Sequence, residues 1–184
     1  MRRAAWFNLV GEGLRELQDR FEGFDPDRLA ENEEFVSVVA ETTRIAMATH
    51  RAEKLEALRN AVLNTALGLS IDDVQQRVFI QLLEQFSCSH IEILGIMSDR
   101  KKNPKGIPHQ YDMKFQDDCM TAIDFNLPYK LEQDAVDAVF EHLYLNKLMS
   151  YNRAEGFERN NSGDKLTTRA GNRFLRFISN PILA

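Results

Sequence analysis

Two cysteines and two histidines are of the residue types that could ligate a metal ion. These residues are Cys88, His90, His109 and Cys119. Two thiolates and two imidazoles would suit the tetrahedral coordination of zinc. Zinc fingers carry their ligands as closely spaced pairs of like residues, whereas here a Cys-x-His pair is followed by an isolated histidine and an isolated cysteine. We therefore expect no metal site, and we expect both cysteines to pack as small apolar side chains.

The glycines and paired acids do not form a pattern typical of catalysis. Residues 11–13 read GEG but lack the Lys-Ser or Lys-Thr pair that completes a phosphate-binding loop. Residues 72–73 and 117–118 are adjacent aspartates, and neighbouring side chains on a helix point about 100° apart, so neither pair could easily share a proton or a metal ion. No motif combines a nucleophile, a base and an oxyanion donor. We expect a protein that is not an enzyme and that needs no cofactor.

Basic residues are concentrated in the second half of the chain. Residues 1–98 contain 10 basic and 16 acidic residues, whereas residues 99–184 contain 13 basic and 12 acidic residues. A basic segment could neutralise phosphates, which supplies most of the non-specific affinity for DNA. The candidate residues for nucleic-acid binding are Lys101, Lys102, Lys105, Gln133, Arg153, Arg159, Lys165 and Arg169.

The helix that would read bases has the opposite charge. Residues 130–144 contain four acids, Glu132, Asp134, Asp137 and Glu141, against the single Lys130. Base reading normally requires Arg, Lys, Asn or Gln at the positions that face the groove, and only Gln133 meets this requirement. Because the whole chain carries a net charge of −5, DNA binding is the alternative function here, and protein binding is the leading one.

Length and composition are those of a globular protein. The chain has 184 residues, of which 43% are hydrophobic and 28% are charged. These values exclude a disordered polyelectrolyte, a collagen-like chain and a disulfide scaffold, and the length suits one domain or one domain with a helical appendage. No apolar run approaches the roughly 18 residues that would cross a bilayer. Two cysteines fit a reducing compartment, so we predict a cytoplasmic protein that does not bind membranes.

The elements that must position these residues are predicted to be helices in the first half. Amphipathic spacing over residues 12–98 predicts four or five helices joined by very short turns. Asp25-Pro26 is a typical start for a helix that runs to about His50, and Gly68 is a typical stop for the next helix. Ser70 is the predicted cap of the helix that follows. Short turns between such helices favour antiparallel neighbours and hence a bundle.

The second half of the sequence contains segments that predict loops and turns. Residues 100–108 contain two prolines, a glycine and four basic residues, which predicts a loop. A short helix near residues 115–123 and a longer one over residues 132–148 are predicted after it. The sequence NNSGD at residues 160–164 is a turn cluster between two predicted strands, near residues 148–151 and 165–168. A last helix is predicted from Arg169 to Ile178.

This order of elements resembles the winged helices of MarR- and PadR-like regulators. Residues 166–175, LTTRAGNRFL, are similar to the L-T-x-x-G-x-x-F/L-L segment that closes the wing in those proteins. Residues 143–149, LYLNKLM, resemble the L-x-x-x-G-L-I stretch that leaves their recognition helix, with Lys147 in place of glycine. The resemblance implies a winged helix in which Thr168, or Thr167, caps the last helix.

A second resemblance covers more of the chain. Residues 54–64, KLEALRNAVLN, together with SHI at 89–91 and FLRFI at 174–178, look like a group of uncharacterised bacterial proteins. That resemblance implies a bacterial or phage origin and a helical front joined to a winged-helix-like tail. It carries no established activity.

Together these observations predict a mainly α protein. Residues 1–87 are expected to form a helical bundle, and residues 88–184 a winged-helix-like domain with one small β-hairpin. The predicted function is that of a non-enzymatic cytoplasmic interaction module that binds a protein partner or a second copy of itself, as a homodimer. The alternative is a winged-helix transcriptional regulator that binds DNA.

Overall fold

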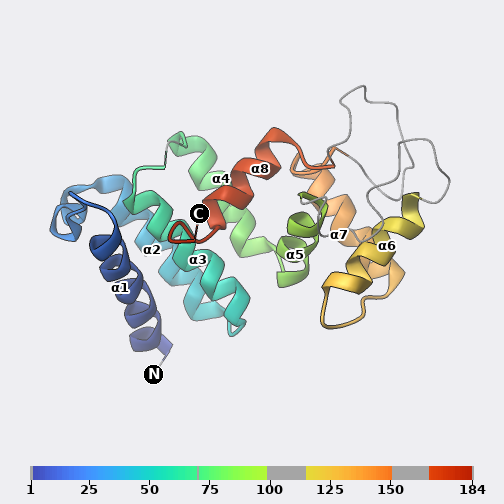
Figure 1. The fold of residues 1–184 in the computed structure, drawn as a ribbon, viewed down its shortest axis with the longest axis horizontal. Coiled ribbons are helices and arrows are strands. Elements are labelled where there is room, and N and C mark those ends of the chain that lie inside the picture. The colour runs from blue at the N-terminus through green and yellow to red at the C-terminus, as the bar shows by residue number, and fades with distance from the viewer. Residues whose placement is uncertain (1, 70, 99–114, 151–165, 184) are drawn as a thin grey trace. The chain divides into compact units, whose positions relative to one another are not determined.

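The computed structural model describes residues 2–69, 71–98, 115–150 and 166–183. These residues are mainly helical, as predicted (Figure 1). The chain forms two compact units, one of Met1–Cys88 with Arg176–Ala184 and one of Ser89–Leu175. The sequence-based division placed residues 88–184 in one domain, whereas the structure groups Arg176–Ala184 with the N-terminal residues. Within the described ranges, no helix combines the length and the apolar character needed to span a membrane.

The helices follow one another with short connections in the first unit. Its elements are α1 (Arg2–Arg20), the 3-10 helix η1 (Pro26–Glu31), α2 (Glu33–Ala48), α3 (Ala52–Ala66) and α4 (Asp73–Gln85). The remaining helices are α5 (Cys88–Ser98), α6 (Phe115–Asn126), α7 (Gln133–Leu145) and α8 (Arg169–Ile178). The loop predicted at 100–108 and the turn cluster predicted at 160–164 lie outside the described residues.

The start of α2 differs from its prediction because two capping residues lie close together. The Asp25 carboxylate accepts from the backbone N–H of Asp27 at 3.0 Å, but it opens only the 3-10 helix η1. The Asn32 side chain then accepts from the backbone N–H of Phe35 at 3.1 Å and begins α2. The predicted single helix is therefore two elements. On α2, Val36 is 49% exposed, whereas Val38 is buried.

Helix α3 is the centre of the first unit and packs against α1 and α2. Residues 57–65 are all buried, so the helix is covered on every side, as a central helix must be (Figure 1). Its end was predicted from Gly68, and this prediction is confirmed. The N–H of Gly68, at φ +69°, binds the carbonyl of Thr65 at 2.9 Å, and the next N–H, of Leu69, binds that of Asn64 at 3.0 Å.

A buried arginine joins α3 to α1. The Arg59 guanidinium lies 3.0 Å from the Glu16 carboxylate and 3.2 Å from the carbonyl oxygen of Leu9. Helix α1 approaches closely at Gly13, where an added Cβ would lie 2.8 Å from the Leu63 side chain and 2.9 Å from the Arg59 side chain. The glycine therefore makes room for the buried guanidinium.

Two asparagines of α3 hold the C-terminal end of α8. The Asn60 amide donates to the carbonyl of Ile178 at 3.0 Å, and the Asn64 amide donates to those of Phe177 at 2.9 Å and Ser179 at 2.8 Å. The last carbonyls of a helix have no partner within it and need other donors. These hydrogen bonds explain why Arg176–Ala184 belongs to the first unit.

In the second unit, α7 ends in a Schellman motif. The N–H of Leu148 binds the carbonyl of Leu143 at 3.0 Å, and the N–H of Lys147 binds that of Tyr144 at 2.8 Å. Lys147, which makes the turn in this motif, has a φ of 60°. It is the one non-glycine residue with positive φ among the described residues, and it occupies the position where the resembling regulators carry glycine.

An antiparallel bridge between Met149 and Thr167 follows this turn. Backbone hydrogen bonds from Ser150 to Leu166 at 2.9 Å and from Thr168 to Leu148 at 3.0 Å flank the bridge. These residues belong to the two segments predicted to form strands. The rest of the predicted hairpin lies in residues 151–165, outside the described ranges.

Thr168, one of the two threonines that the resemblance implied as caps, begins α8. Its hydroxyl oxygen accepts from the backbone N–H of Gly171 at 3.0 Å, which satisfies a free donor at the start of the helix. Gly171 is required here because a Cβ at this position would lie 2.1 Å from the carbonyl oxygen of Leu148. Gly171 is the glycine of the L-T-x-x-G pattern. It thus lets the first turn of α8 lie directly against the backbone of Leu148.

Candidate functional site

The structure describes two of the eight residues predicted to bind nucleic acid. Gln133 is the first residue of α7 and Arg169 is the first residue of α8, and both are exposed. No hydrogen bond or ion pair joins the two in the described part of the second unit. The other six predicted residues lie outside the described ranges: Lys101, Lys102, Lys105, Arg153, Arg159 and Lys165.

The solvent-facing side of α7 is acidic. Asp134, Ala138, Glu141 and Leu145 are all exposed, and their spacing places them on one face of the helix. The opposite face is buried through residues such as Phe140 and packs into the unit. Leu145 is 63% exposed, so this acidic face ends in an apolar side chain. The residues that would meet a partner on α7 are therefore two carboxylates and a leucine.

The four residues weighed as zinc ligands are not brought together in the described structure. The Cys88 thiol lies 3.8 Å from the Glu53 carboxylate, and Cys119 is buried, as expected of a small apolar side chain. His109 lies outside the described residues. Among those that are described, no group of three or more Cys, His, Asp or Glu side chains is arranged to hold a metal ion.

His90 instead lies against His142, a contact that the sequence did not predict. Nε2 of His90 is 3.1 Å from Nδ1 of His142, and the rings meet edge to face with centroids 5.0 Å apart. Glu92, also on α5, accepts a hydrogen bond from the Tyr129 hydroxyl. These contacts join α5 to α7 and to the segment after α6. Residues 90 and 142 are far apart in sequence, so no local pattern signals their pairing.

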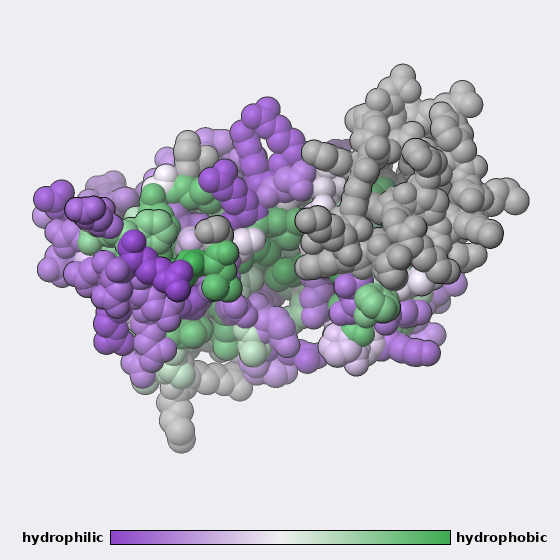
Figure 2. Space-filling view, viewed as in Figure 1, coloured by the Kyte–Doolittle hydropathy of each residue, from purple (hydrophilic) through white to green (hydrophobic). Residues whose placement is uncertain are grey.

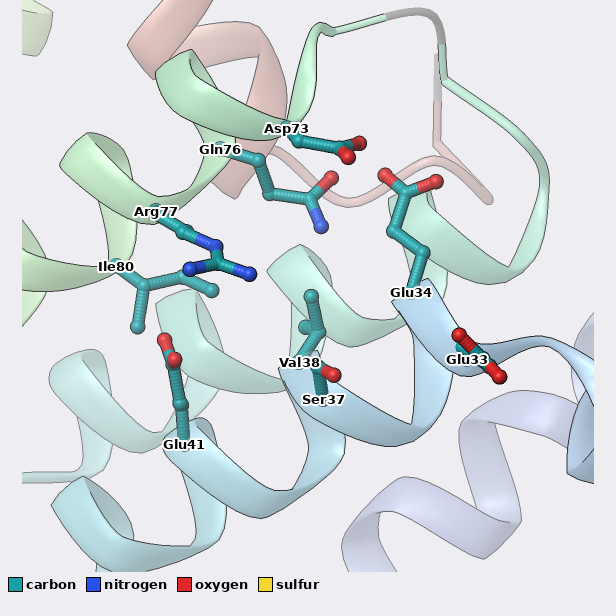
Figure 3. Close-up of a pocket in the computed structure, with 9 residues that line it drawn as sticks. All are labelled: Glu33, Glu34, Ser37, Val38, Glu41, Asp73, Gln76, Arg77 and Ile80. Carbon is teal, nitrogen blue, oxygen red and sulfur yellow. The ribbon is translucent and has the colours of Figure 1, made fainter.

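A second candidate site is a cleft between α2 and α4 in the first unit (Figure 3). Its volume is about 170 Å³. Helix α2 provides Glu33, Glu34, Ser37, Val38 and Glu41, and α4 provides Asp73, Gln76, Arg77 and Ile80. Four carboxylates against one guanidinium give the lining a formal charge of −3. In the sequence these acids belong to the solvated sides of separate helices. The cleft itself could not be predicted, because it exists only where the two helices face each other.

Helix spacing and caps explain how the residues reach the cleft. Residues 34, 37, 38 and 41 lie on one face of α2, and residues 73, 76, 77 and 80 lie on one face of α4. Helix α4 begins at Asp72, whose side chain accepts from the backbone N–H of Gln75 at 2.9 Å. Asp72 thus caps this helix, two residues after the predicted Ser70.

Gln76 lies at the centre of the cleft lining. Its side chain extends from α4 toward Val38 and lies between Arg77 and Glu34 in the close-up view (Figure 3). Gln76 is only 5% exposed, and its amide has no hydrogen-bond partner in the described structure. The amide is therefore a free donor and acceptor that faces the cleft.

Two basic side chains hold α4 in place beside this cleft. Arg44 of α2 donates to both carboxylate oxygens of Glu84, each at 2.6 Å, and this hydrogen bonding lowers the pKa of Glu84 and raises that of Arg44. Lys54 donates to the carbonyls of Glu84 at 2.9 Å and Phe86 at 2.8 Å, at the end of α4. Burial lowers the pKa of Lys54.

The described surface in the view of Figure 2 is mostly hydrophilic over α1 and α8, with small and separate hydrophobic areas. Exposed large apolar side chains are present, among them Val74 and Leu145.

A comparison of the chain with protein-family models, with curated proteins and with solved structures finds no match. The site geometry therefore carries the functional argument.

Proposed function

We propose that the chain is a non-enzymatic interaction module of the bacterial cytoplasm, in which a winged-helix-like unit binds a protein partner through the acidic face of α7. The observation that carries this proposal is the exposure of Asp134 and Glu141 on the helix that a DNA-binding winged helix would place in the groove. Carboxylates at those positions repel phosphates and favour a basic protein segment.

The winged-helix assignment is supported by the local geometry around α7 and α8. The turn at Lys147, the Met149–Thr167 bridge, the Thr168 cap and the close approach at Gly171 lie where the resemblance to MarR- and PadR-like regulators implies them. Winged helices serve as protein-binding as well as DNA-binding modules, so the fold alone does not decide between them.

The partner that suits α7 is a basic segment with an apolar residue. Asp134 and Glu141 would face its charges, and Leu145 would supply apolar contact at the end of the same face. A fluorescently labelled peptide of alternating lysine and leucine tests this. We expect binding that weakens with salt, because exposed charges are screened. The double variant Asp134→Asn with Glu141→Gln should weaken binding about tenfold, which is about 1.4 kcal/mol.

A matched control makes the test specific to α7. Glu12 and Asp19 are exposed on α1 with the same seven-residue spacing. The variant Glu12→Gln with Asp19→Asn changes the net charge equally and should leave the affinity within about twofold, a span below the effect of one direct charged contact. Equal losses in both variants would show that the peptide binds the general negative charge of the protein, and would contradict the proposal.

A second copy of the chain is the other protein partner that this module could bind. Flanking helices often form a two-fold interface in small regulators, and a symmetric dimer is the most common oligomer. Sedimentation velocity over a range of protein concentrations distinguishes a homodimer from a monomer that awaits a different partner. A dimer disrupted by the α7 variant would identify the same acidic face as the self-association surface.

The alternative function, DNA binding, is favoured by α8. This helix has no acidic residue, and it exposes Arg169 and Arg173. Anisotropy titrations with random duplex DNA at low salt decide the matter, because counterion release favours binding most strongly there. We expect no binding. Binding that falls steeply with salt and weakens in Arg169→Gln would replace the protein-binding proposal with the regulator.

A further inference from the structure

We infer that the cleft between α2 and α4 is a binding site for a primary alkylammonium group, carried by a free polyamine or by a lysine side chain. The observations that carry this inference are the Gln76 amide, which has no partner among the described residues, and the excess of carboxylates in the lining of the same small cleft (Figure 3). The site lies in the first unit and is independent of the role proposed for α7.

The charge of the cleft selects a cation. Glu33, Glu34, Glu41 and Asp73 line it, with Arg77 as the one basic lining residue. None of these carboxylates forms an ion pair in the described structure. Acids in the first turn of a helix also interact favourably with its dipole, which accounts for Glu33, Glu34 and Asp73. It does not account for Glu41, which lies two turns further along α2.

Gln76 supplies an observation independent of the charges. The residue is only 5% exposed, and its amide has no partner among the described residues and is directed into the cleft (Figure 3). Because the amide atoms are not among the sealed, unpartnered atoms of the described structure, they are accessible to a ligand. An ammonium that enters the cleft would donate one hydrogen bond to the amide oxygen of Gln76. Its other N–H groups would donate hydrogen bonds to the nearby carboxylates.

The size and lining of the cleft define the ligand further. A volume of about 170 Å³ is below the range of roughly 300–1,000 Å³ typical of sites for drug-sized ligands. Val38 and Ile80 give the cleft an apolar part that suits the methylenes of an alkyl chain. A metal ion is not favoured, because no three ligating side chains converge in the described residues. An ammonium carries three N–H donors and a compact charge, so the Gln76 amide and a single carboxylate can bind it without the convergence of ligands that a metal ion needs.

Isothermal titration calorimetry on the full chain at low salt tests the inference with two probes. Spermidine represents the free polyamine, and Nα-acetyl-lysine methylamide represents a lysine side chain. Binding of either probe supports an alkylammonium site, and their relative affinities identify the source. No heat and no change in thermal stability with either probe at millimolar concentration would overturn the inference.

Substitutions assign the binding to this cleft. Gln76→Met removes the amide at nearly constant size, and we expect at least a tenfold loss of affinity with no loss of thermal stability, because the amide has no partner to lose. Glu41→Gln should weaken binding about fivefold. Arg77→Met should strengthen it, because the substitution removes the one lining cation.

The matched control for Glu41→Gln is Glu56→Gln on α3, an exposed acid outside the cleft. It should leave the affinity unchanged. Equal effects of the two glutamate variants would show that the probe binds the overall negative charge, and would overturn the inference. If Gln76→Met fails to fold, its amide has a structural role and the Glu41→Gln and Arg77→Met comparison still decides. The α7 variant should bind both probes as the unsubstituted protein does.

Discussion

Single residues in this protein show which parts of a sequence pattern reflect backbone geometry. Gly68 and Lys147 occupy the same position in two Schellman motifs, at φ of 69° and 60°. Glycine adopts this conformation freely, whereas a residue with a Cβ pays roughly 1–2 kcal/mol for it. Lys147 therefore makes the same turn as Gly68 although it carries a Cβ.

We expect Lys147→Gly to stabilise the second unit by about 0.5–1 kcal/mol. The substitution relieves the left-handed conformation but removes the contact of the Lys147 ammonium with the Tyr144 ring, 5.5 Å from its centroid, which is worth about 0.5–1 kcal/mol. Chemical denaturation measures the difference.

Lys147→Ala is the control for this prediction. It removes the same ring contact but keeps a Cβ at positive φ, so it should be less stable than both the glycine variant and the unsubstituted protein. If Lys147→Gly destabilises the protein, the turn does not carry the strain that its dihedral angle implies.

At the scale of elements, pairs of helices are joined by contacts that the sequence pattern does not show. Arg44 and Glu84 join α2 to α4 through two parallel hydrogen bonds, and both side chains are largely exposed. Hydrogen bonding from Arg44 lowers the pKa of Glu84 below its ordinary value of 4.5. The carboxylate is thus more readily deprotonated in the folded protein than in the unfolded chain.

This shift predicts the direction of a pH effect. Because the folded-state pKa of Glu84 is depressed, its stabilising contribution is present above the ordinary value of 4.5 and is lost as the pH falls through the folded-state value. A double-mutant cycle with Arg44→Gln and Glu84→Gln should show a favourable coupling at pH 7 that shrinks at high salt and is weaker at pH 3. A coupling that is the same at pH 7 and pH 3 would show that the ion pair does not act in solution.

Local signals and long-range contacts were predictable to different degrees. The stop at Gly68, the cap at Thr168 and the mainly helical fold followed from residues close together in sequence. The start of α2 was wrong because two good caps compete within a short segment, and only packing selects Asn32. The pairing of His90 with His142 and the cleft at Gln76 each need two helices to meet, which no local spacing specifies.

At the scale of the whole molecule, Asn64 has an influence beyond its own helix. Its buried amide donates to the carbonyls of Asn60, Phe177 and Ser179, and so connects α3 to the end of α8. The sequence did not indicate this role, because the partners of Asn64 outside α3 lie far along the chain, at Phe177 and Ser179.

We expect Asn64→Ala to lower the free energy of unfolding of the first unit by about 2–3 kcal/mol, because buried carbonyls lose their donor. Limited proteolysis should then cut first near Ser179. Asn64→Asp has nearly the same shape but places carboxylate oxygens against those carbonyls, so it should be less stable still. Stability within about 0.5 kcal/mol of the unsubstituted protein in both variants would contradict this role, since surface substitutions have effects of that size.

The hydrogen bonds from Asn60 and Asn64 to the end of α8 have a consequence for biosynthesis. The chain leaves the first unit at Cys88 and returns to it at Arg176, so the second unit is an insertion nested within the first. Domains usually fold in the order in which they leave the ribosome. Here the hydrogen bonds of Asn60 and Asn64 to residues 177–179 can form only after the whole inserted unit has been synthesised.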